Sequence, residues 1–348
     1  MSTIYSHDFF IQWHLTERCN LRCSHCYQSG HSKGELSFEQ VRDVATEVSD
    51  MLEAWSERYD MEFSPSFNIT GGEPFLRQDL FNILDHLGGR GFDLFLLTNG
   101  TLIDREAALR LAMTSVKGVQ VSVEGPEEIH DSIRGRGSFA SSLRGISFLL
   151  DAGLTVTLNA TLSDLNADHL TSMVLLASSM GAQRLGFSRL VPSGRGAGLI
   201  QQMMSKARVR RIYEEIFSMK PENLKIVTGD PVASQMSAEP GAQDQGAIPT
   251  GGCAAGVSGL TFLPDGTIIP CRRLPVSVGN VRTDDLREVW ATSEVLGALR
   301  DRNRYGGRCG TCKRWADCRG CRAIAYAYSQ SMGGEDFLCE DPQCFIGE

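Results

Sequence analysis

Residues 10–27, FIQWHLTERCNLRCSHCY, join a short apolar segment to three closely spaced cysteines. Residues 10–15 are mostly apolar or aromatic and predict a strand. Cys19, Cys23 and Cys26 follow at the spacing Cys-x3-Cys-x2-Cys. Three thiolates can bind three irons of a [4Fe–4S] cube and leave the fourth iron open to another ligand. The spacing is therefore typical of an iron–sulfur site with one open position.

Two other interpretations fit the same three cysteines. His25 or His31 would complete a four-coordinate zinc site, or the thiols would be buried without a metal. Spacing alone does not choose between these interpretations, so the remainder of the chain has to decide.

Alternating strands and helices follow the cysteines. The predicted strands are 10–15, 66–70, 94–98, 119–123, 155–160 and 184–190, and the predicted helices are 37–55, 79–90, 104–114, 139–152, 166–180 and 206–220. This alternation predicts an α/β fold with a parallel sheet and helical crossovers, in which six units form a partial (β/α)6 TIM-like barrel. Sites in such sheets lie at the carboxyl ends of the strands, where the first cysteines stand.

The remaining eight cysteines divide the chain into regions. The chain has 348 residues and 11 cysteines, none of them between Cys26 and Cys253. We expect a core at 1–215, a bridging helix and linker at 216–252, and a small Cys-rich α+β domain at 253–348. In this last domain, 261–263 and 267–269 predict a hairpin, and 286–299 and 322–329 predict helices.

Charge and hydropathy exclude several classes of protein. The net charge is −8, which argues against a general nucleic-acid binder. No apolar run approaches the roughly 20 residues that span a bilayer, so we expect no membrane partner. The first ten residues have no signal-peptide pattern, so we expect a cytoplasmic protein whose cysteines bind metal rather than form disulfides.

Residues 19–27 resemble the Cys-x3-Cys-x-aromatic-Cys signature of the radical S-adenosylmethionine (SAM) superfamily, with His25 at the ring position. Residues 71–74, Gly-Gly-Glu-Pro, resemble the motif that holds the amino group of SAM in that family. The resemblance implies a [4Fe–4S] cluster, SAM, a 5′-deoxyadenosyl radical, and an electron donor such as flavodoxin or ferredoxin. It implies cofactor contacts from His25, Tyr27, Gly71, Gly72, Glu73, Pro74, Asn99, Ser122, Glu124, Arg134, Asn159 and Arg189, the two arginines being alternative partners for the SAM carboxylate.

The C-terminal cysteines resemble the SPASM domain, which carries one or two auxiliary [4Fe–4S] clusters in many radical SAM enzymes. Only two residues precede its fourth closely spaced cysteine here, where three are usual. A zinc ribbon on the four closely spaced cysteines is the alternative. The resemblance implies an outer cluster on Cys309, Cys312, Cys318 and Cys344, and an inner cluster on Cys253, Cys271 and Cys321, whose fourth ligand is Cys339, a non-thiolate group or nothing.

The whole chain resembles mycofactocin-type peptide maturases and the radical SAM enzymes of haem biosynthesis. The first resemblance implies oxidation or crosslinking of a peptide, with a separate peptide-recognition protein as a further partner. The second implies side-chain removal from a tetrapyrrole or another small molecule, and Arg189, Arg195, Arg272 and Arg273 are candidate anchors for its carboxylates. A non-catalytic electron carrier is the third hypothesis, which the SAM motifs disfavour.

Overall fold

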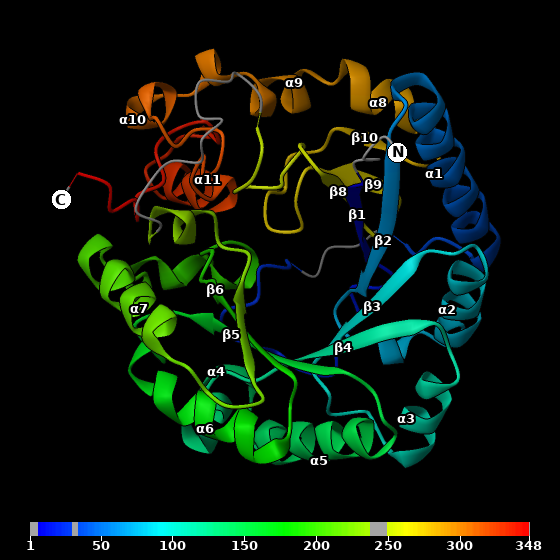
Figure 1. Cartoon of the computed structure of the whole chain (residues 1–348), viewed down its shortest axis with the longest axis vertical. Coiled ribbons are helices and arrows are strands. Elements are labelled where there is room, and N and C mark those ends of the chain that lie inside the picture. Colours follow the sequence, from blue (N-terminus) through cyan, green and yellow to red (C-terminus); the bar gives the residue numbers. More distant parts are fainter. Residues whose placement is uncertain (1–5, 30–33, 237–248, 348) are drawn as a thin grey trace, which may run out of the picture.

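A computed structural model describes residues 6–29, 34–236 and 249–347. His31 and most of the predicted linker after residue 236 therefore lie outside the described residues. Within the described residues, ten strands form one sheet in the order β10-β9-β8-β1-β2-β3-β4-β5-β6-β7. Figure 1 shows this sheet curving into a ring with helices on its outer side.

Seven parallel strands build the barrel. They are β1 (Ser6–His14), β2 (Glu62–Thr70), β3 (Asp93–Thr98), β4 (Val116–Ser122), β5 (Val156–Leu162), β6 (Arg184–Arg189) and β7 (Lys225–Thr228). The predicted parallel α/β sheet is confirmed, and its six strands correspond to β1–β6. The prediction of a bridging helix and linker across 216–252 missed β7, because four residues are too short to show a period of two.

Helices between the strands cover the outside of the barrel (Figure 1). They are α1 (Phe38–Tyr59), α2 (Leu80–Gly89), α3 (Arg105–Ala112), α4 (Glu127–Arg134), α5 (Ser138–Asp151), α6 (Leu170–Met180) and α7 (Lys206–Ser218). Helix α1 begins at a capping box, in which Ser37 Oγ accepts from Gln40 N–H and Gln40 Oε1 accepts from Ser37 N–H. Helix α4 has no counterpart among the predicted helices.

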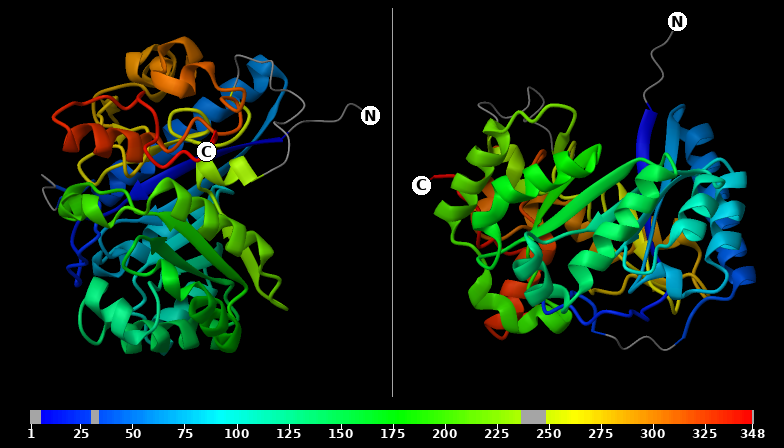
Figure 2. Two further views of the ribbon diagram at one scale, coloured as in Figure 1. Left: turned by 90° about the vertical axis from the view of Figure 1, so that its left-hand side faces the viewer. Right: turned by 90° about the horizontal axis from the view of Figure 1, so that it is seen from below.

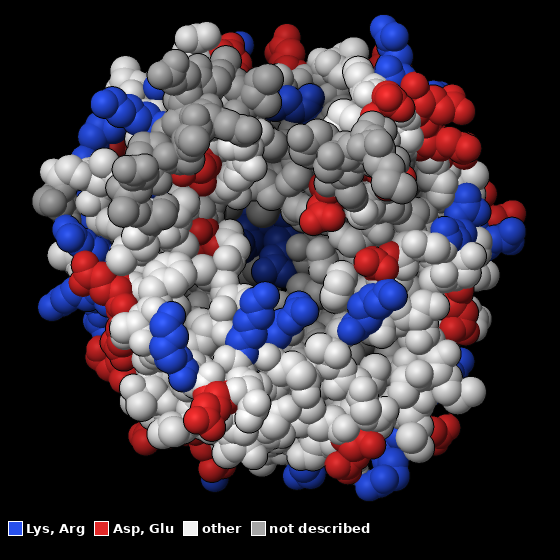
Figure 3. All heavy atoms as spheres, in the orientation of Figure 1, with Lys and Arg blue, Asp and Glu red and all other residues white. Residues whose placement is uncertain are grey.

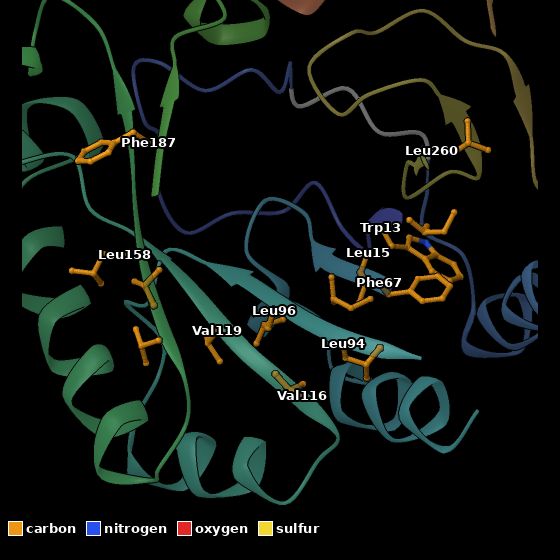
Figure 4. Packing of buried hydrophobic residues seen from close by; sticks show 14 of the residues in the cluster. Trp13, Leu15, Phe67, Leu94, Leu96, Val116, Val119, Leu158, Phe187 and Leu260 are labelled. Atoms are coloured by element: carbon orange, nitrogen blue, oxygen red, sulfur yellow. The ribbon is translucent and has the colours of Figure 1, made fainter. Parts of the chain in front are cut away.

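Alternate residues of the strands face opposite sides of the sheet. Trp13, Phe67 and Leu158 are fully buried and pack between the sheet and the helices (Figure 4). The residues that alternate with these apolar residues along each strand point into the barrel. On β4 and β5 some of them are polar, as at Gln120 and Asn159. The apolar side of each strand therefore builds the core, and the polar side lines the interior.

The C-terminal region continues the same sheet. Its elements are β8 (Gly259–Phe262), β9 (Thr267–Ile269), β10 (Gly279–Asn280), α8 (Leu286–Thr292), α9 (Glu294–Arg300), α10 (Gly307–Thr311) and α11 (Arg322–Ser331). Strand β8 pairs with β9 as the predicted hairpin and also runs parallel to β1. A Cβ at Gly259 would lie 2.2 Å from Phe10 O, so only glycine permits this pairing. The predicted helix 286–299 is two helices, because Ser293 caps α9.

These C-terminal elements occupy the part of the ring that β1–β7 leave open (Figure 1). Figure 2 shows the same arrangement from two further directions. The Cys-rich region is therefore packed against the barrel, and three of its cysteines, Cys253, Cys271 and Cys321, line a cavity together with residues of the barrel strands.

Candidate functional site

The loop with the first three cysteines is fixed by backbone contacts with the end of β2. Gly72 N–H donates to Thr16 O at 2.7 Å, and Glu73 N–H donates to Arg18 O at 2.8 Å. A Cβ at Gly71 would lie 2.4 Å from Thr16 O, and one at Gly72 would lie 2.3 Å from Arg18 O. The two glycines are thus required for the two chain segments to approach each other.

Glu73 supports this arrangement from inside the protein. Its carboxylate is fully buried and accepts hydrogen bonds from Thr98 Oγ1 and from Asn99 N–H, both at 2.8 Å. Burial raises the pKa of Glu73 to about 7 although these hydrogen bonds favour the ionised form. Neither Glu73 nor Pro74 lines the cavity beside the cysteines. The Glu73 side chain therefore supports the Gly-Gly-Glu-Pro segment from behind, and the predicted contact of this motif with the cofactor comes from residues that line the cavity, Gly71 and Gly72.

A second buried carboxylate organises the other side of the cysteine loop. Glu124 Oε1 accepts from Arg134 Nε at 2.8 Å and lies 3.4 Å from His25 Nε2, while Oε2 accepts from Thr161 N–H at 2.8 Å. Burial favours the neutral acid, but Arg134 and His25 outweigh it and hold the pKa of Glu124 well below its usual range. Arg134 Nη1 also lies 3.8 Å from Cys23 Sγ. Glu124 was expected to contact the cofactor, but it is fully buried and orients its two neighbours instead.

The segment after β6 packs on the same loop. Gly194 adopts φ 57°, and a Cβ there would lie 2.2 Å from Tyr27 O. Gly196 N–H donates to Cys26 O at 2.9 Å. Gly194 and Gly196 therefore pack on the end of the cysteine loop, whereas the residues after β2 pack on its start.

The first cavity, of about 130 Å3, lies within this frame. Most of the residues predicted to bind the first cluster and SAM line it. These are Cys19, Cys23, His25, Cys26, Tyr27, Gly71, Gly72, Asn99, Ser122, Arg134 and Asn159.

Arg189 does not line this cavity, and the prediction that it meets the SAM carboxylate is wrong. Its side chain is 1% exposed, and all three guanidinium nitrogens donate hydrogen bonds within the protein. Nε donates to Asp230 at 2.6 Å, Nη2 to Asp341 at 2.8 Å and Nη1 to Gln343 at 2.9 Å. Asp341 in turn accepts from Cys321 N–H at 2.8 Å. Arg189 thus joins the barrel to the C-terminal cysteines.

A second cavity, of about 440 Å3, lies next to the first. Three C-terminal cysteines, Cys253, Cys271 and Cys321, line it together. Figure 3 shows basic side chains inside the central hollow of the molecule. The residues that line both cavities are Gln120, Asn159, Ser188, Arg272 and Arg273.

A third, small cavity of about 40 Å3 is lined by Cys309, Cys312, Cys318 and Cys344. Cys339 lies outside it, with Sγ 3.2 Å from Asp336 O. The sulfurs that line the cavity receive N–H donors. Gln235 Nε2 lies 3.5 Å from both Cys318 Sγ and Cys344 Sγ, Gly320 N–H donates to Cys318 Sγ, Arg314 N–H donates to Cys312 Sγ, and Arg322 Nη2 lies 3.9 Å from Cys309 Sγ.

These surroundings suit iron–sulfur clusters. Burial raises the pKa of Cys318 to about 11 and that of Cys321 to about 12, so the free thiols are neutral and a bound metal has to displace their protons. N–H donors to sulfur are the groups that tune cluster potentials. In the described ranges, no three His, Cys, Asp or Glu side chains form a group that fits a single metal ion.

The family model of the radical SAM superfamily matches residues 13–177, and that of the SPASM iron–sulfur cluster-binding domain matches residues 253–322. The AdoMet-dependent heme synthase of Methanosarcina barkeri is 33% identical over 96% of this chain and 95% of its own length. The chain belongs to the radical SAM superfamily. This radical SAM–SPASM protein is accordingly an enzyme whose cofactors are [4Fe–4S] clusters and SAM.

A further relative and two solved structures resemble this chain over most of its length. Mycofactocin maturase MftC of Mycobacterium tuberculosis is 31% identical over 97% of this chain and 83% of its own length. Streptococcus suis SuiB bound to S-adenosylmethionine shares the fold, with a TM-score of 0.74 and 17% identity over 98% of this chain and 76% of that chain. The AdoMet-bound anSMEcpe also shares the fold, with a TM-score of 0.72 and 19% identity over 96% of this chain and 93% of that chain. Among the described residues, no helix of this enzyme is long and apolar enough to cross a membrane.

Several cavity residues on β4, β5 and β6 were not among the predicted site residues. Gln120, Thr161 and Ser188 line the first cavity but belong to no motif. Their signal was a period of two, because polar residues alternate with buried apolar residues on β4, β5 and β6. Such alternation also marks a solvent-exposed sheet face, so it does not by itself reveal an interior.

Proposed function

We propose that this radical SAM–SPASM enzyme oxidises a substrate held in the second cavity, between the cysteine loop of residues 19–26 and a cluster on Cys253, Cys271 and Cys321. The five residues shared by the two cavities carry this proposal. When bound, the first cluster and SAM supply a 5′-deoxyadenosyl radical that removes a hydrogen atom. Formation of a closed-shell oxidised product then releases an electron, and an adjoining cluster is a suitable acceptor.

We infer the cluster ligands from the three cavities. Cys19, Cys23 and Cys26 hold the cluster whose open iron binds SAM, and the four cysteines of the third cavity hold the outer cluster. The inner cluster has three cysteine ligands and one position that no cysteine of the second cavity fills. Cys339 lines neither cavity, so this proposal gives it no cluster to bind.

The chain's own residues hold SAM in place in this proposal. The backbone of Gly71 and Gly72 lines the cavity. The buried Glu73 carboxylate, which accepts from Asn99 N–H, keeps this backbone in position. Arg134 lines the first cavity, is oriented by Glu124 and would bind the SAM carboxylate. Asn99, Ser122 and Asn159 complete the polar wall.

A peptide is the first candidate substrate. The similarity to mycofactocin maturase MftC extends over nearly the whole chain. A flavodoxin or ferredoxin is the proposed electron donor, and a separate protein that recognises the peptide is a proposed partner.

A tetrapyrrole is the second candidate substrate. Two observations favour it: the 33% identity with the M. barkeri heme synthase, and the arginine pair inside the second cavity. Both substrate classes require the same radical and the same electron acceptor, so the cysteine sites do not distinguish them.

The test is an anaerobic turnover assay with SAM and dithionite, in which 5′-deoxyadenosine and substrate mass are followed together. Wild-type enzyme is expected to form 5′-deoxyadenosine and an oxidised product. Cys321→Ser is expected to keep 5′-deoxyadenosine formation but to lose most of the oxidised product, because the inner cluster loses a ligand. Equal product yield from both proteins would contradict the electron-acceptor role. Parallel assays with coproporphyrin-type substrates and with peptides identify the substrate class.

A further inference from the structure

Five arginines are buried in the described residues, and two of them differ from the others in their partners. Arg77, Arg189 and Arg314 each form an ion pair with at least one aspartate. Arg319 is 2% exposed and Arg322 is 0% exposed, and neither forms an ion pair with an acidic side chain in the part of the chain that the structure describes. A buried charge is costly unless an opposite charge lies beside it, so these two guanidinium groups require an anion.

The hydrogen bonds of the two arginines go mostly to neutral backbone oxygens. Arg319 donates to four of them, of which Cys253 O lies 2.6 Å from Nη2. Arg322 Nη1 donates to Cys339 O at 2.7 Å and to Phe337 O at 3.1 Å, and its buried Nε has no partner among the described residues. Carbonyl oxygens accept these hydrogen bonds but carry no net charge, so both positive charges remain uncompensated.

The two guanidinium groups lie beside the outer group of C-terminal cysteines. Arg322 Nη2 is 3.9 Å from Cys309 Sγ, and Arg319 lines the third cavity together with the four cysteines of that cavity. Arg319 also binds the carbonyl of Cys253, which belongs to the inner group. Arg322 directly follows Cys321, another member of the inner group. Each arginine therefore adjoins residues of both proposed auxiliary cluster sites.

The carboxylate of Asp341 supplies only part of the required negative charge. It packs against Gly320, as Arg322 does, but it forms its ion pair with Arg189 at 2.8 Å. Arg189 is also paired with Asp230 at 2.6 Å, so two aspartates and one arginine together carry a single negative charge. The two arginines without ion pairs carry two positive charges, and the cysteines beside them become anionic when they bind iron.

We propose that Arg319 and Arg322 are counter-ions of the outer iron–sulfur cluster and stabilise its reduced form. A cube held by four thiolates is an anion, and reduction adds one more negative charge to it. A cation buried beside the cube stabilises this added charge strongly, because little solvent screens the interaction. The pair thereby raises the reduction potential of the outer cluster and makes it a better acceptor for an electron that leaves the inner site. This inference rests on the cluster ligands assigned in the proposed function and adds the residues that set one potential.

The experiment measures the midpoint potential of the outer cluster in the reconstituted holoenzyme, by EPR during a dithionite titration without SAM or substrate. The outer signal is the one that Cys344→Ser changes, because Cys344 lines the third cavity. Arg319→Gln and Arg322→Gln should each make the midpoint potential more negative by at least about 59 mV, which is a tenfold fall in the equilibrium constant for one-electron reduction.

Arg300→Gln is the matched control. Arg300 is a partly buried arginine of the same region that also donates to two backbone oxygens, those of Gly256 and Trp290, but it lines none of the three cavities that contain cysteines. Its loss should move the outer potential by much less. An equal shift in the control, or an unchanged potential in both Arg319→Gln and Arg322→Gln, would overturn the proposal.

Arg322→Lys separates the effect of charge from that of shape. If Arg322→Gln loses the roughly four irons of the outer cluster and Arg322→Lys keeps them, the requirement for a cation is supported by cluster assembly itself. Loss of these irons from both variants would overturn the counter-ion role. A protein in which Cys344→Ser changes no EPR signal would refute the cluster assignment of the proposed function and this inference with it, whereas an unchanged potential refutes the counter-ion role alone.

Discussion

The two groups of cysteines around the central cavities are assembled in opposite ways. Residues 19–26 supply three cysteines from one loop, and that loop is held by backbone contacts with the ends of β2 and β6. Cys253, Cys271 and Cys321 come from three separate segments and meet only because Arg189 and other buried polar groups tie those segments to the barrel.

Arg319 shows how the second group is held. It adopts a left-handed φ of 57° and its guanidinium donates to four backbone oxygens, among them those of Gly251 and Cys253. The first loop also has a buried network, in which Glu124 binds Arg134 and lies beside His25, but its three cysteines are already brought together by their short spacing in the chain. Side chains orient a site carried by one loop, whereas in a site assembled from distant segments they also have to hold the segments together.

The largest effect is expected from removing the whole local site. A variant with Cys19→Ala, Cys23→Ala and Cys26→Ala should form no 5′-deoxyadenosine. Its iron content after anaerobic reconstitution should fall from about 12 to about 8 per chain, as expected for loss of one of three cubes. Loss of all iron would show that the two groups do not assemble independently.

Arg189→Met should have the next largest effect and should act on the distant site. It leaves Asp230 and Asp341 buried without their cation, which costs roughly 3–5 kcal/mol in free energy of unfolding. We expect auxiliary iron to be lost before the iron of residues 19–26, as followed by iron content and Mössbauer spectra during urea titration. Arg208→Met, which breaks a partly exposed pair with Asp164, is the control and should cost no more than about 1 kcal/mol.

Gly72→Ala tests the backbone packing of the local site. The added Cβ would lie 2.3 Å from Arg18 O, so the cysteine loop has to move. We expect 5′-deoxyadenosine formation to fall at least about 10-fold, because SAM and the cluster are then misaligned. Gly89→Ala, at the end of α2, meets no atom within 4 Å and should leave the rate unchanged. Similar rates in the two variants would contradict the packing argument.

The smallest effect concerns the carboxylate behind the local site. Burial raises the pKa of Glu73 to about 7 from 4.5, so the folded protein holds this proton more tightly than the unfolded chain. The stability contributed by this group is complete at low pH and is lost as the pH rises through about 7. Between pH 5.5 and 8, the loss in free energy of unfolding should be about 2 kcal/mol. Glu73→Gln should remove this slope in anaerobic urea titrations, and an unchanged slope would assign it to another group.

The fold was largely predictable because its signals are local. The strands β1–β6 and most outer helices follow from hydrophobic periodicity, which needs only neighbouring residues. The two elements that were not predicted, α4 and β7, are short. The pairing of β8 with β1 was also not predicted, because the two strands are distant in sequence. The glycine that permits this pairing, Gly259, is recognisable only when Phe10 lies beside it.

The amino-acid sequence alone determined the family, the three cysteines of the first site and the presence of a second Cys-rich region. These features depend on residue type and short spacing, which the chain carries without folding. Only the tertiary structure decided which C-terminal cysteines share a cavity, that Arg189 joins the barrel to the C-terminal region, and that Arg272 and Arg273 line both central cavities. Partners such as Arg189 and Asp341 lie far apart in the chain, and whether a buried charge is paired depends on which segments the fold brings into contact.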